Sequence, residues 1–347
     1  MSTVVQLAQL DTEYNADSVE WCHFGGYEDI VSCGTYELEE GKESDESRRI
    51  GLLHLYQVES SGETHDVKIE KLQSVKTSGL LDMKWLSVRR FPVLLATAVA
   101  SGHVDLYTVK EDEDLSKLSL QKLGSHPVTD SLCLSLDSSS SDCGVRLVVS
   151  NSPGTVAVLN DTESELKTTV SWKAHDFEAW IATWDRWNQN TVFTGGDDCK
   201  LKFWDLRSLD RPHHICKRHT MGVCSISSHP SQPHILATGS YDEMVCVWDT
   251  RNMRRSLCEV GVGGGVWRLK WHPSDKRLLL AACMHNGCNV LSCQTELGSI
   301  TTVVSYQEHK SLLYGIDWGY TNLKGNHQSV IASCSFYDRK FHIWCYR

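Results

Sequence analysis

The chain has 347 residues, of which 41% are hydrophobic and 22% are charged, ordinary values for a globular protein with a sizeable core. The formal net charge is −10. This charge argues against a nucleic-acid binder, because binding to phosphates needs a positive surface. We therefore expect no direct contact with nucleic acid.

The first residues, MSTVVQLAQLDTEYNADS, lack the basic region and the apolar run of a signal peptide. No segment approaches the roughly 18 consecutive apolar residues that a membrane helix needs. The 14 cysteines occur without a CxxC pair or a zinc-finger spacing, which favours buried, reduced thiols. We expect a cytoplasmic protein with no membrane association and no metal site.

The N-terminal part of the chain contains one isolated predicted strand and then three stretches of strand-like alternation. The isolated strand lies within residues 3–10, and the three stretches cover residues 17–58, 77–110 and 126–160. Acidic or serine-rich segments interrupt these stretches, and we predict that they are solvated loops. They are residues 37–49, 111–117 and 137–142.

The middle of the chain contains a repeat. Residues 174–207 and 218–251 align with each other without gaps, and His175 and His219 are 44 residues apart. This spacing lies within the roughly 40–45-residue period of WD repeats, each of which forms one four-stranded blade.

Two weaker copies of the repeat follow at residues 261–294 and 308–347, and the N-terminal stretches are more degenerate copies, for a total of seven. We therefore predict an all-β fold, a seven-bladed WD40 β-propeller. The strand within residues 3–10 is predicted to join the last blade as its outer strand and so to close the ring. No Pro- or Gly-rich linker divides the chain, so we expect a single domain over residues 1–347.

Each of the two best copies contains the residues that form the internal hydrogen-bond network of a WD blade. These sets are His175, Thr194, Asp198 and Trp204, and His219, Thr238, Asp242 and Trp248. An Asp–His pair also suggests catalysis, but the structural interpretation is favoured, because buried polar groups must find partners.

Residues that the repeat does not dictate gather at one predicted opening of the propeller. In this fold, the loop before the first strand of each blade and the turn between its second and third strands surround one mouth of the channel. Aligning the copies places six aromatic residues there: Trp180, Trp267, Tyr36, Tyr241, Tyr314 and Tyr337. Beside them the alignment places Asp17, Asp197, Glu178 and His285. Aromatic faces and carboxylates suit a quaternary ammonium group, although such aromatic residues could also simply plug the channel.

Several stretches are more specific than a generic WD repeat. They are FEAWIATWDRWNQNTVFTGGDDCKLKFWD, KRHTMGVCSI, HILATGSYDEMVCVWDTRNM, GGGVWRLKWHP, LLLAACMH and ASCSFYD. On these stretches the chain resembles the WD-repeat family of diphthine methyl ester hydrolases, also named diphthine methyltransferases. The resemblance runs from ADSVEW to FHIW and is weakest in the first three blades and the acidic loops.

This resemblance implies a reaction on elongation factor 2, which would be the protein partner. A histidine of that factor becomes methylated diphthine, which bears a trimethylammonium group and a methyl ester. The hydrolase removes the ester methyl, giving diphthine and methanol, so that a separate enzyme can amidate the carboxylate. No donor cofactor is implied. The trimethylammonium group is also the ligand that the predicted aromatic mouth would suit.

An ester hydrolase must activate water or supply a nucleophile, and must stabilise an oxyanion. His285 is the first candidate for the general base, because its turn position is predicted to aim it at the mouth and imidazole exchanges protons near neutral pH. It could equally be a loop histidine without a role. Cys224 is an alternative nucleophile if a neighbour lowers its pKa, and otherwise a buried apolar thiol. Asp197 is predicted either to orient His285 or to pair with the substrate cation.

Two other functions stay open at this point. The chain could be a non-catalytic platform that binds elongation factor 2 or a diphthamide synthase, or, with less support, a substrate adaptor of a ubiquitin ligase. The adaptor hypothesis comes from Arg207 and Arg251 in the endings WDLR and WDTR, which blade structure explains equally well. We expect a monomer, because a closed propeller protects its strand edges.

Overall fold

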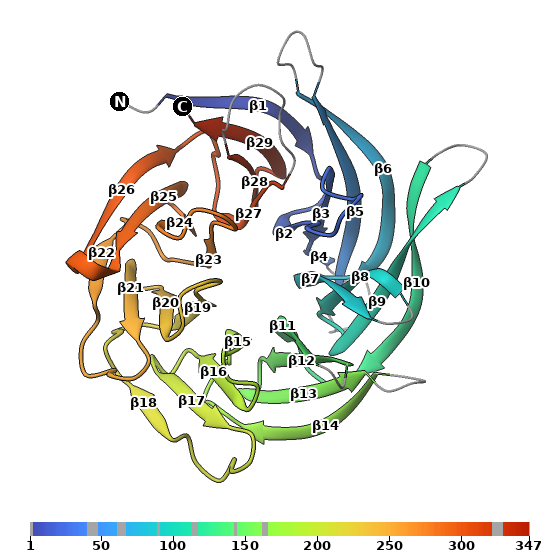
Figure 1. The fold of residues 1–347 in the computed structure, drawn as a ribbon. Coiled ribbons are helices and arrows are strands. Elements are labelled where there is room, and N and C mark those ends of the chain that lie inside the picture. The colour runs from blue at the N-terminus through green and yellow to red at the C-terminus, as the bar shows by residue number, and fades with distance from the viewer. Residues whose placement is uncertain are drawn as a thin grey trace. The chain divides into compact units, whose positions relative to one another are not determined.

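A computed structural model of the protein consists almost entirely of antiparallel β-sheets (Figure 1). Residue contacts divide the chain into two compact units. Unit 1 consists of Met1–Asp130 and His309–Arg347, and unit 2 of Ser131–Glu308. The single domain stays a prediction. The residues that the structure describes are 3–39, 48–60, 67–88, 91–112, 117–141, 144–161, 166–320 and 329–346.

The described residues of unit 1 form three sheets. The first contains β2 (Ala16–Trp21), β3 (Ile30–Thr35), β5 (Arg48–Ser60) and β6 (Val67–Ser78), with the short β4 (Glu37–Glu39) paired to the start of β5. The second contains β7 (Leu80–Val88), β8 (Phe91–Val99), β9 (His103–Asp112) and β10 (Lys117–Pro127). The third contains β27 (Leu313–Trp318), β28 (Val330–Ser335), β29 (Lys340–Tyr346) and β1 (Val4–Asp11).

The third sheet of unit 1 joins the two ends of the sequence. β1 pairs with β29 antiparallel, from Val4 opposite Tyr346 to Asp11 opposite Lys340, and lies at the outer edge of this sheet (Figure 1). The predicted closing strand is therefore confirmed. Its backbone hydrogen bonds to β29 complete a fourth strand for a C-terminal sheet that would otherwise have three.

The described residues of unit 2 form four sheets of four strands each. The first contains β11 (Cys133–Ser141), β12 (Gly144–Asn151), β13 (Thr155–Asp161) and β14 (Leu166–Lys173), and the second β15 (Ile181–Trp184), β16 (Thr191–Gly195), β17 (Leu201–Asp205) and β18 (His214–Cys216). The third contains β19 (Val223–Ser228), β20 (Ile235–Ser240), β21 (Met244–Asp249) and β22 (Cys258–Gly261). The fourth contains β23 (Arg268–Trp271), β24 (Leu278–Ala282), β25 (Cys288–Gln294) and β26 (Ser299–Tyr306). A single 3₁₀ turn, Thr295–Leu297, joins β25 to β26.

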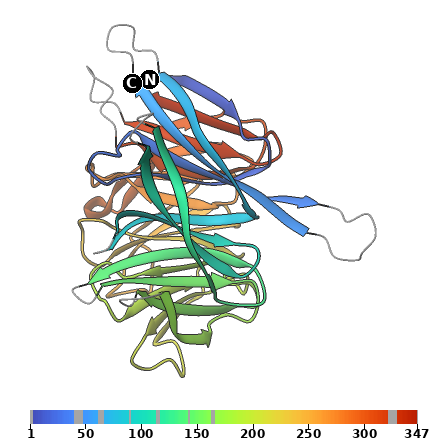
Figure 2. The ribbon, with the colours of Figure 1, turned by 90° about the vertical axis from the view of Figure 1, so that its right-hand side faces the viewer.

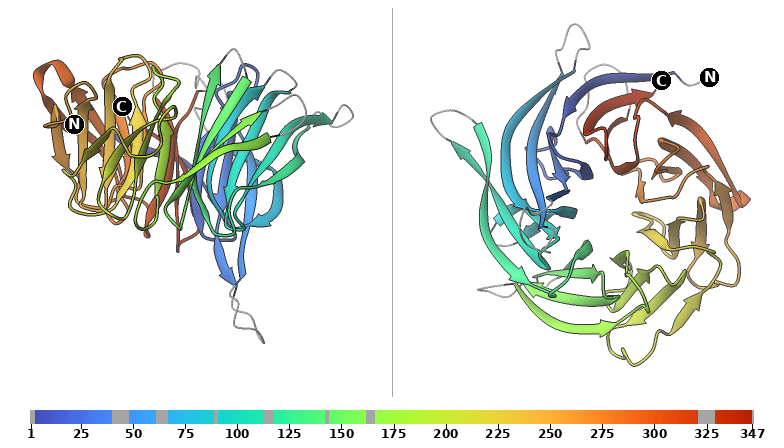
Figure 3. Two further views of the ribbon diagram at one scale, coloured as in Figure 1. Left: turned by 90° about the horizontal axis from the view of Figure 1, so that it is seen from below. Right: turned by 180° about the vertical axis from the view of Figure 1, so that it is seen from behind.

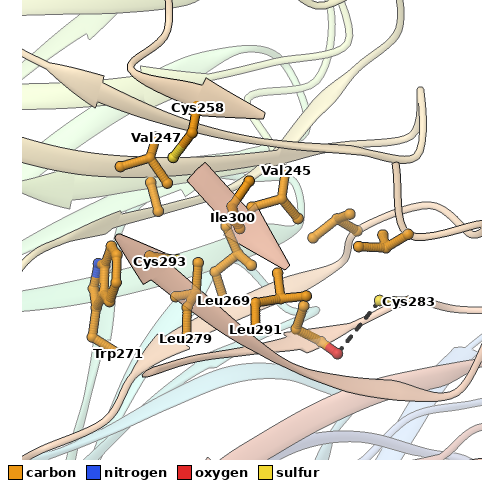
Figure 4. Close-up of a cluster of buried hydrophobic side chains, with 14 residues drawn as sticks. Val245, Val247, Cys258, Leu269, Trp271, Leu279, Cys283, Leu291, Cys293 and Ile300 are labelled. Atoms are coloured by element: carbon orange, nitrogen blue, oxygen red, sulfur yellow. Dashed lines mark hydrogen bonds between the residues drawn. The ribbon is translucent and has the colours of Figure 1, made fainter. Parts of the chain in front are cut away.

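Neighbouring sheets of unit 2 meet through apolar layers, one of which Figure 4 shows. Val245 and Val247 of β21 belong to the same buried cluster as Leu269 and Trp271 of β23 and Leu279 of β24. Alternate residues of a strand share a face, so two residues from each of β21 and β23 enter this layer. Each buried aliphatic side chain stabilises the fold by about 1.5–3 kcal/mol relative to exposure.

The predicted internal network is present in both of the best repeats. His175 Nδ1 hydrogen-bonds to Asp198 at 2.8 Å, and His175 Nε2 to Thr194 Oγ1 at 2.7 Å. The Trp204 indole donates to the same hydroxyl at 2.9 Å. His219, Asp242, Thr238 and Trp248 repeat this arrangement. These polar groups satisfy one another inside their sheets, which confirms their structural interpretation.

The three segments predicted as solvated loops are in part strands, so that prediction is wrong for their described residues. Residues 137–141 belong to β11, where Asp137 accepts hydrogen bonds from the Thr183 hydroxyl and, at 2.9 Å, from the Trp184 N–H. Residues 37–39, 48–49, 111–112 and 117 also lie in strands, whereas residues 40–47, 113–116 and 142 lie outside the described residues. Strand pairing satisfies the backbone groups of these residues, and the donors from Thr183 and Trp184 satisfy the Asp137 carboxylate.

The first sheet of unit 1 carries an extension at one end. β3 pairs with the part of β5 that begins at Leu53, whereas β4 pairs with residues Arg48 to Ile50. The paired β4 and β5 segments therefore reach beyond β3, as the blue strands in Figures 2 and 3 show.

No helix among the described residues has the length and apolar character needed to cross a membrane.

Candidate functional site

A repeated backbone hydrogen bond marks one end of the sheets. In unit 2, the N–H of Asp197 donates to Glu178 O at 2.9 Å and that of Tyr241 to Gly222 O at 3.0 Å. Each bond joins the turn after the second strand of a sheet to the loop before its first strand. The structure therefore places Asp197 and Tyr241 at equivalent positions, as the alignment predicted. Trp180 follows Glu178 by two residues and lies at the same end of its sheet.

Three aromatic rings of unit 2 are packed against one another at this end. The Trp180 and Trp267 rings have centroids 5.5 Å apart, Trp180 and Tyr241 6.2 Å, and Tyr241 and Trp267 5.9 Å. The interplanar angles of 53–77° are those of tilted and edge-to-face contacts. All three side chains are half-buried, so each also retains exposed ring surface. We term Trp180, Tyr241 and Trp267 the tryptophan cluster.

An exposed carboxylate lies against this cluster. The Trp180 indole N–H donates to Asp197 Oδ1 at 3.1 Å. Within the described residues, neither Asp197 nor the nearby half-buried Glu178 forms an ion pair with a lysine or arginine. A carboxylate without a cationic partner, next to aromatic faces, creates a negative potential that favours a bound cation.

Two glycines, which the sequence pattern does not distinguish from the others, allow this close packing. A Cβ on Gly222 would lie 2.7 Å from Asp197 Oδ1 and 3.1 Å from the Tyr241 ring. A Cβ on Gly265 would lie 2.8 Å from Met284 Sδ and 3.2 Å from the Tyr241 ring. The glycine-rich run at 261–265 thus brings the backbone against the cluster. Only contacts between loops of different sheets reveal this role.

His285 is exposed in the tight turn between β24 and β25. The next residue, Asn286, hydrogen-bonds through its side-chain amide to Val262 O and so fixes the turn against the glycine-rich loop. Within the described residues, His285 has no hydrogen-bond partner and Asp197 bonds to Trp180 instead. Asp197 therefore does not hydrogen-bond to His285 in this structure, and the hypothesis that it orients His285 stays a prediction. The role of His285 as a general base stays a prediction.

Cys224 does not have the environment of a nucleophile. Its side chain is 3% exposed, and its thiol donates to Gly222 O at 3.3 Å. Burial raises its pKa well above the usual value, so the thiol stays neutral. The structure thus supports the alternative that the sequence left open, a buried apolar thiol.

The other three predicted aromatic residues lie in unit 1, around a fourth ring that was not predicted. Phe336 has its centroid 6.0 Å from Tyr36, 5.4 Å from Tyr314 and 4.9 Å from Tyr337. We term these four residues the Phe336 cluster. The aromatic pair in the segment SFYD was the available sequence signal.

The alignment was one residue off in the last two repeats. Leu279 lies opposite Trp271 as Ile331 lies opposite Trp318, so Met284, not His285, takes the equivalent turn position in the sheet of β23 to β26. The Phe336 N–H donates to Leu312 O at 2.9 Å, and that of Tyr36 to Asn15 O at 2.8 Å, the same repeated hydrogen bond that Asp197 and Tyr241 make. Phe336, not Tyr337, therefore occupies the equivalent turn position. Because successive strand residues point to opposite faces, such a shift changes which side chain faces a neighbour.

Asp17, predicted to lie beside the aromatic residues, is only 4% exposed and sits within β2 of unit 1. A buried carboxylate cannot contact a bound cation at the surface, so this prediction is wrong. Within the described residues, no group of three or more His, Cys, Asp or Glu side chains could hold a metal ion.

Comparisons with known proteins give both a fold and a family. Residues 210–249 match the family described as "WD domain, G-beta repeat". A chain in a solved structure, "Crystal Structure of Mitotic Checkpoint Complex", aligns with a TM-score of 0.69 at 15% identity, covering 98% of this chain and 94% of that one. Together with the seven sheets, these matches confirm the predicted fold class, an all-β, seven-bladed propeller of the WD-repeat type.

Three curated relatives carry closely related names. "Diphthine methyltransferase" of Mus musculus is 44% identical over 338 residues, which span 92% of this chain and 70% of the relative. "Diphthine methyltransferase homolog" of Dictyostelium discoideum is 35% identical, and "Diphthine methyltransferase" of Schizosaccharomyces pombe is 32% identical. In both of these comparisons the match covers 96% of each chain.

Proposed function

This chain belongs to the diphthine methyltransferase family, and on that premise we propose that it is an enzyme of diphthamide biosynthesis. Its reaction, in this proposal, is hydrolysis of the methyl ester of methylated diphthine on elongation factor 2. Water and the ester give diphthine and methanol, and no methyl donor is consumed. The family name supports the place in the pathway, and the proposed site supports the choice of ligand.

The observation that carries this proposal is the tryptophan cluster with Asp197. Each favourable contact between a quaternary ammonium group and an aromatic face contributes about 0.5–2 kcal/mol. The three rings pack against one another and keep exposed aromatic surface beside the exposed Asp197 carboxylate, to which such a group can bind. The trimethylammonium group of methylated diphthine has this chemistry. Glu178 adds a second carboxylate on the same loop as Trp180.

The proposed reaction uses water as the nucleophile. His285 removes a proton from the water as its oxygen attacks the ester carbonyl, and the C–O bond to the methoxy group then breaks. The proton passes to the departing oxygen, so methanol leaves and a carboxylate remains. Cys224 takes no part, because its raised pKa keeps it neutral. Asp197 contributes by holding the cation of the substrate.

The test is mass spectrometry of elongation factor 2 carrying methylated diphthine, incubated with the purified chain alone. Loss of the mass of one methylene group, together with methanol release and without any added cofactor, supports the hydrolase. The Trp180→Ala variant, which lacks one ring of the proposed cation site, should convert the same substrate more slowly. An unchanged mass, with the factor still bound, would instead identify a non-catalytic platform and would overturn the proposal.

The adaptor hypothesis gains nothing from the two arginines that suggested it. Arg207 pairs with Asp205 at 2.5 Å and Arg251 with Asp249 at 2.7 Å, each within the turn that follows its own strand. These ion pairs explain both arginines as local structure.

A further inference from the structure

The Phe336 cluster has basic neighbours, in contrast to the tryptophan cluster. The Arg49 side chain donates from Nε to the Tyr36 hydroxyl at 3.1 Å. Lys310 is exposed and directly precedes Ser311, whose hydroxyl accepts the Tyr337 backbone N–H at 3.0 Å. A guanidinium group therefore contacts one of these rings, and an exposed lysine is next in sequence to the serine that fixes Tyr337.

Two carboxylates next in sequence to members of this cluster, Glu37 and Asp338, already have hydrogen-bond or ion-pair partners. Glu37 pairs with Arg339 at 3.2 Å. Asp338 accepts hydrogen bonds from the Ser335 hydroxyl and, at 2.9 Å, from the Lys310 backbone N–H. Within the described residues, no acidic side chain pairs with Arg49 or with the Lys310 ammonium group. These two groups therefore remain able to bind a carboxylate of another molecule, and they disfavour a bound cation.

Tyr337 is the most exposed member of the cluster, at 70% of its surface. Its backbone is nevertheless fixed, because its N–H bonds to Ser311 and the preceding Phe336 N–H bonds to Leu312 O at 2.9 Å. Its ring stands at 89° to the Phe336 ring, 4.9 Å away. A large aromatic side chain held in this way loses little conformational entropy on binding, and Tyr and Arg are enriched in interface hot spots.

We propose that the Phe336 cluster, with Arg49 and Lys310, is a docking surface for an acidic segment of the protein substrate. The identity of that partner rests on the proposed function. Carboxylates of the segment would pair with Arg49 and Lys310, and its apolar atoms would cover Tyr337 and Tyr314. Because the whole chain carries a net charge of −10, a basic and aromatic patch gives an acidic segment a defined place to bind. In this proposal, Tyr36, Tyr314 and Tyr337 bind the acidic segment and do not bind the substrate cation.

The experiment measures binding of elongation factor 2 that lacks the histidine modification, by calorimetry, to the full-length chain and its variants. We expect Tyr337→Ala and Arg49→Gln each to weaken binding by about tenfold, and added salt to reduce the effect of Arg49→Gln. The matched controls are Leu123→Ala, at another exposed apolar residue of unit 1, and Arg48→Gln, on the opposite face of β5. Both controls should bind like the unsubstituted chain.

A second measurement separates docking from recognition of the cation. Tetramethylammonium binding should be weakened by Trp180→Ala and unchanged by Tyr337→Ala. If Tyr337→Ala and Arg49→Gln both bind the unmodified factor as tightly as the unsubstituted chain, the proposal of a docking surface is overturned. Loss of tetramethylammonium binding in Tyr337→Ala would also overturn it. Absence of methanol release would defeat the proposed function alone, because binding to the unmodified factor requires no chemistry.

Discussion

The tryptophan cluster of unit 2 and the Phe336 cluster of unit 1 are built at equivalent positions of their sheets, yet the charges beside them are opposite. The same backbone hydrogen bond positions Tyr241 in one cluster and Phe336 in the other. Asp197 accepts the Trp180 N–H in the first, whereas Arg49 donates to Tyr36 in the second. The repeat thus determines where aromatic rings gather, and the charged neighbours determine which ligand each group suits.

The largest expected effect tests whether a residue of unit 2, His285, takes part in ester hydrolysis. His285→Ala should lower kcat for ester hydrolysis by about 100-fold, because a general base contributes a rate factor of this order. KM should change little, because His285 holds none of the proposed cation contacts. Steady-state kinetics on the modified factor measure both values. His213→Ala, at another exposed loop histidine of unit 2, is the control, and full activity of His285→Ala would remove it from the mechanism.

The next effect tests the cation site itself. Trp180→Ala removes one aromatic face and the indole that holds Asp197, so kcat/KM should fall by about 10–30-fold. Trp187→Ala is a matched control, since Trp187 is 47% exposed and lies in a loop of the same unit. Equal losses in the two variants would indicate general destabilisation, not recognition of the substrate.

A smaller effect isolates the charge. Asp197→Asn keeps an oxygen that can accept the Trp180 N–H but removes the negative charge, so KM should rise by about three- to tenfold with little change in kcat. Salt should raise KM less in this variant than in the unsubstituted chain. Asp210→Asn, at an exposed loop position of unit 2, should leave KM unchanged. If Asp197→Asn also leaves KM unchanged, the carboxylate does not contact the cation.

The last effect concerns stability and the polar networks of the two units. In unit 2, His175 and His219 hydrogen-bond to carboxylates, whereas His309 of unit 1 bonds to the hydroxyls of Ser335 and Ser333. His342 stacks on His309 at 3.9 Å. Burial lowers the pKa of His342 to about 4, and burial together with His342 places the pKa of His309 well below its usual range.

Both histidines are therefore neutral in the folded protein and bind protons more readily in the unfolded chain. Their contribution to stability is complete above about pH 6.5 and is lost progressively as the pH falls towards 4. Thermal unfolding should show a Tm several degrees lower at pH 5 than at pH 7. His342→Phe should flatten this dependence, whatever its own stability at pH 7. An unchanged slope would show that other groups cause the acid sensitivity.

Much of the fold could be predicted from the sequence, because the residues of the hydrogen-bond network recur at a fixed spacing in each repeat. His175, Thr194, Asp198 and Trp204 identified one sheet, and the gapless copy 44 residues later identified the next. The lone N-terminal strand could be assigned to the last sheet because that sheet otherwise lacked an outer strand. Strand β4 and the polar ends of β5, β9, β10 and β11 were missed, since local polarity does not show which strand can pair with them.

The sequence by itself determined the repeat, the fold class and the aromatic residues near one end of the sheets. Only the tertiary structure decided the register of the last repeat, where Phe336 takes the place predicted for Tyr337, and the burial of Asp17 and Cys224. It also decided which charges accompany which rings, since Asp197 reaches Trp180 from a turn and Arg49 reaches Tyr36 from strand β5. Periodicity is a local property of the chain, whereas register, burial and charge pairing depend on residues that only folding brings together.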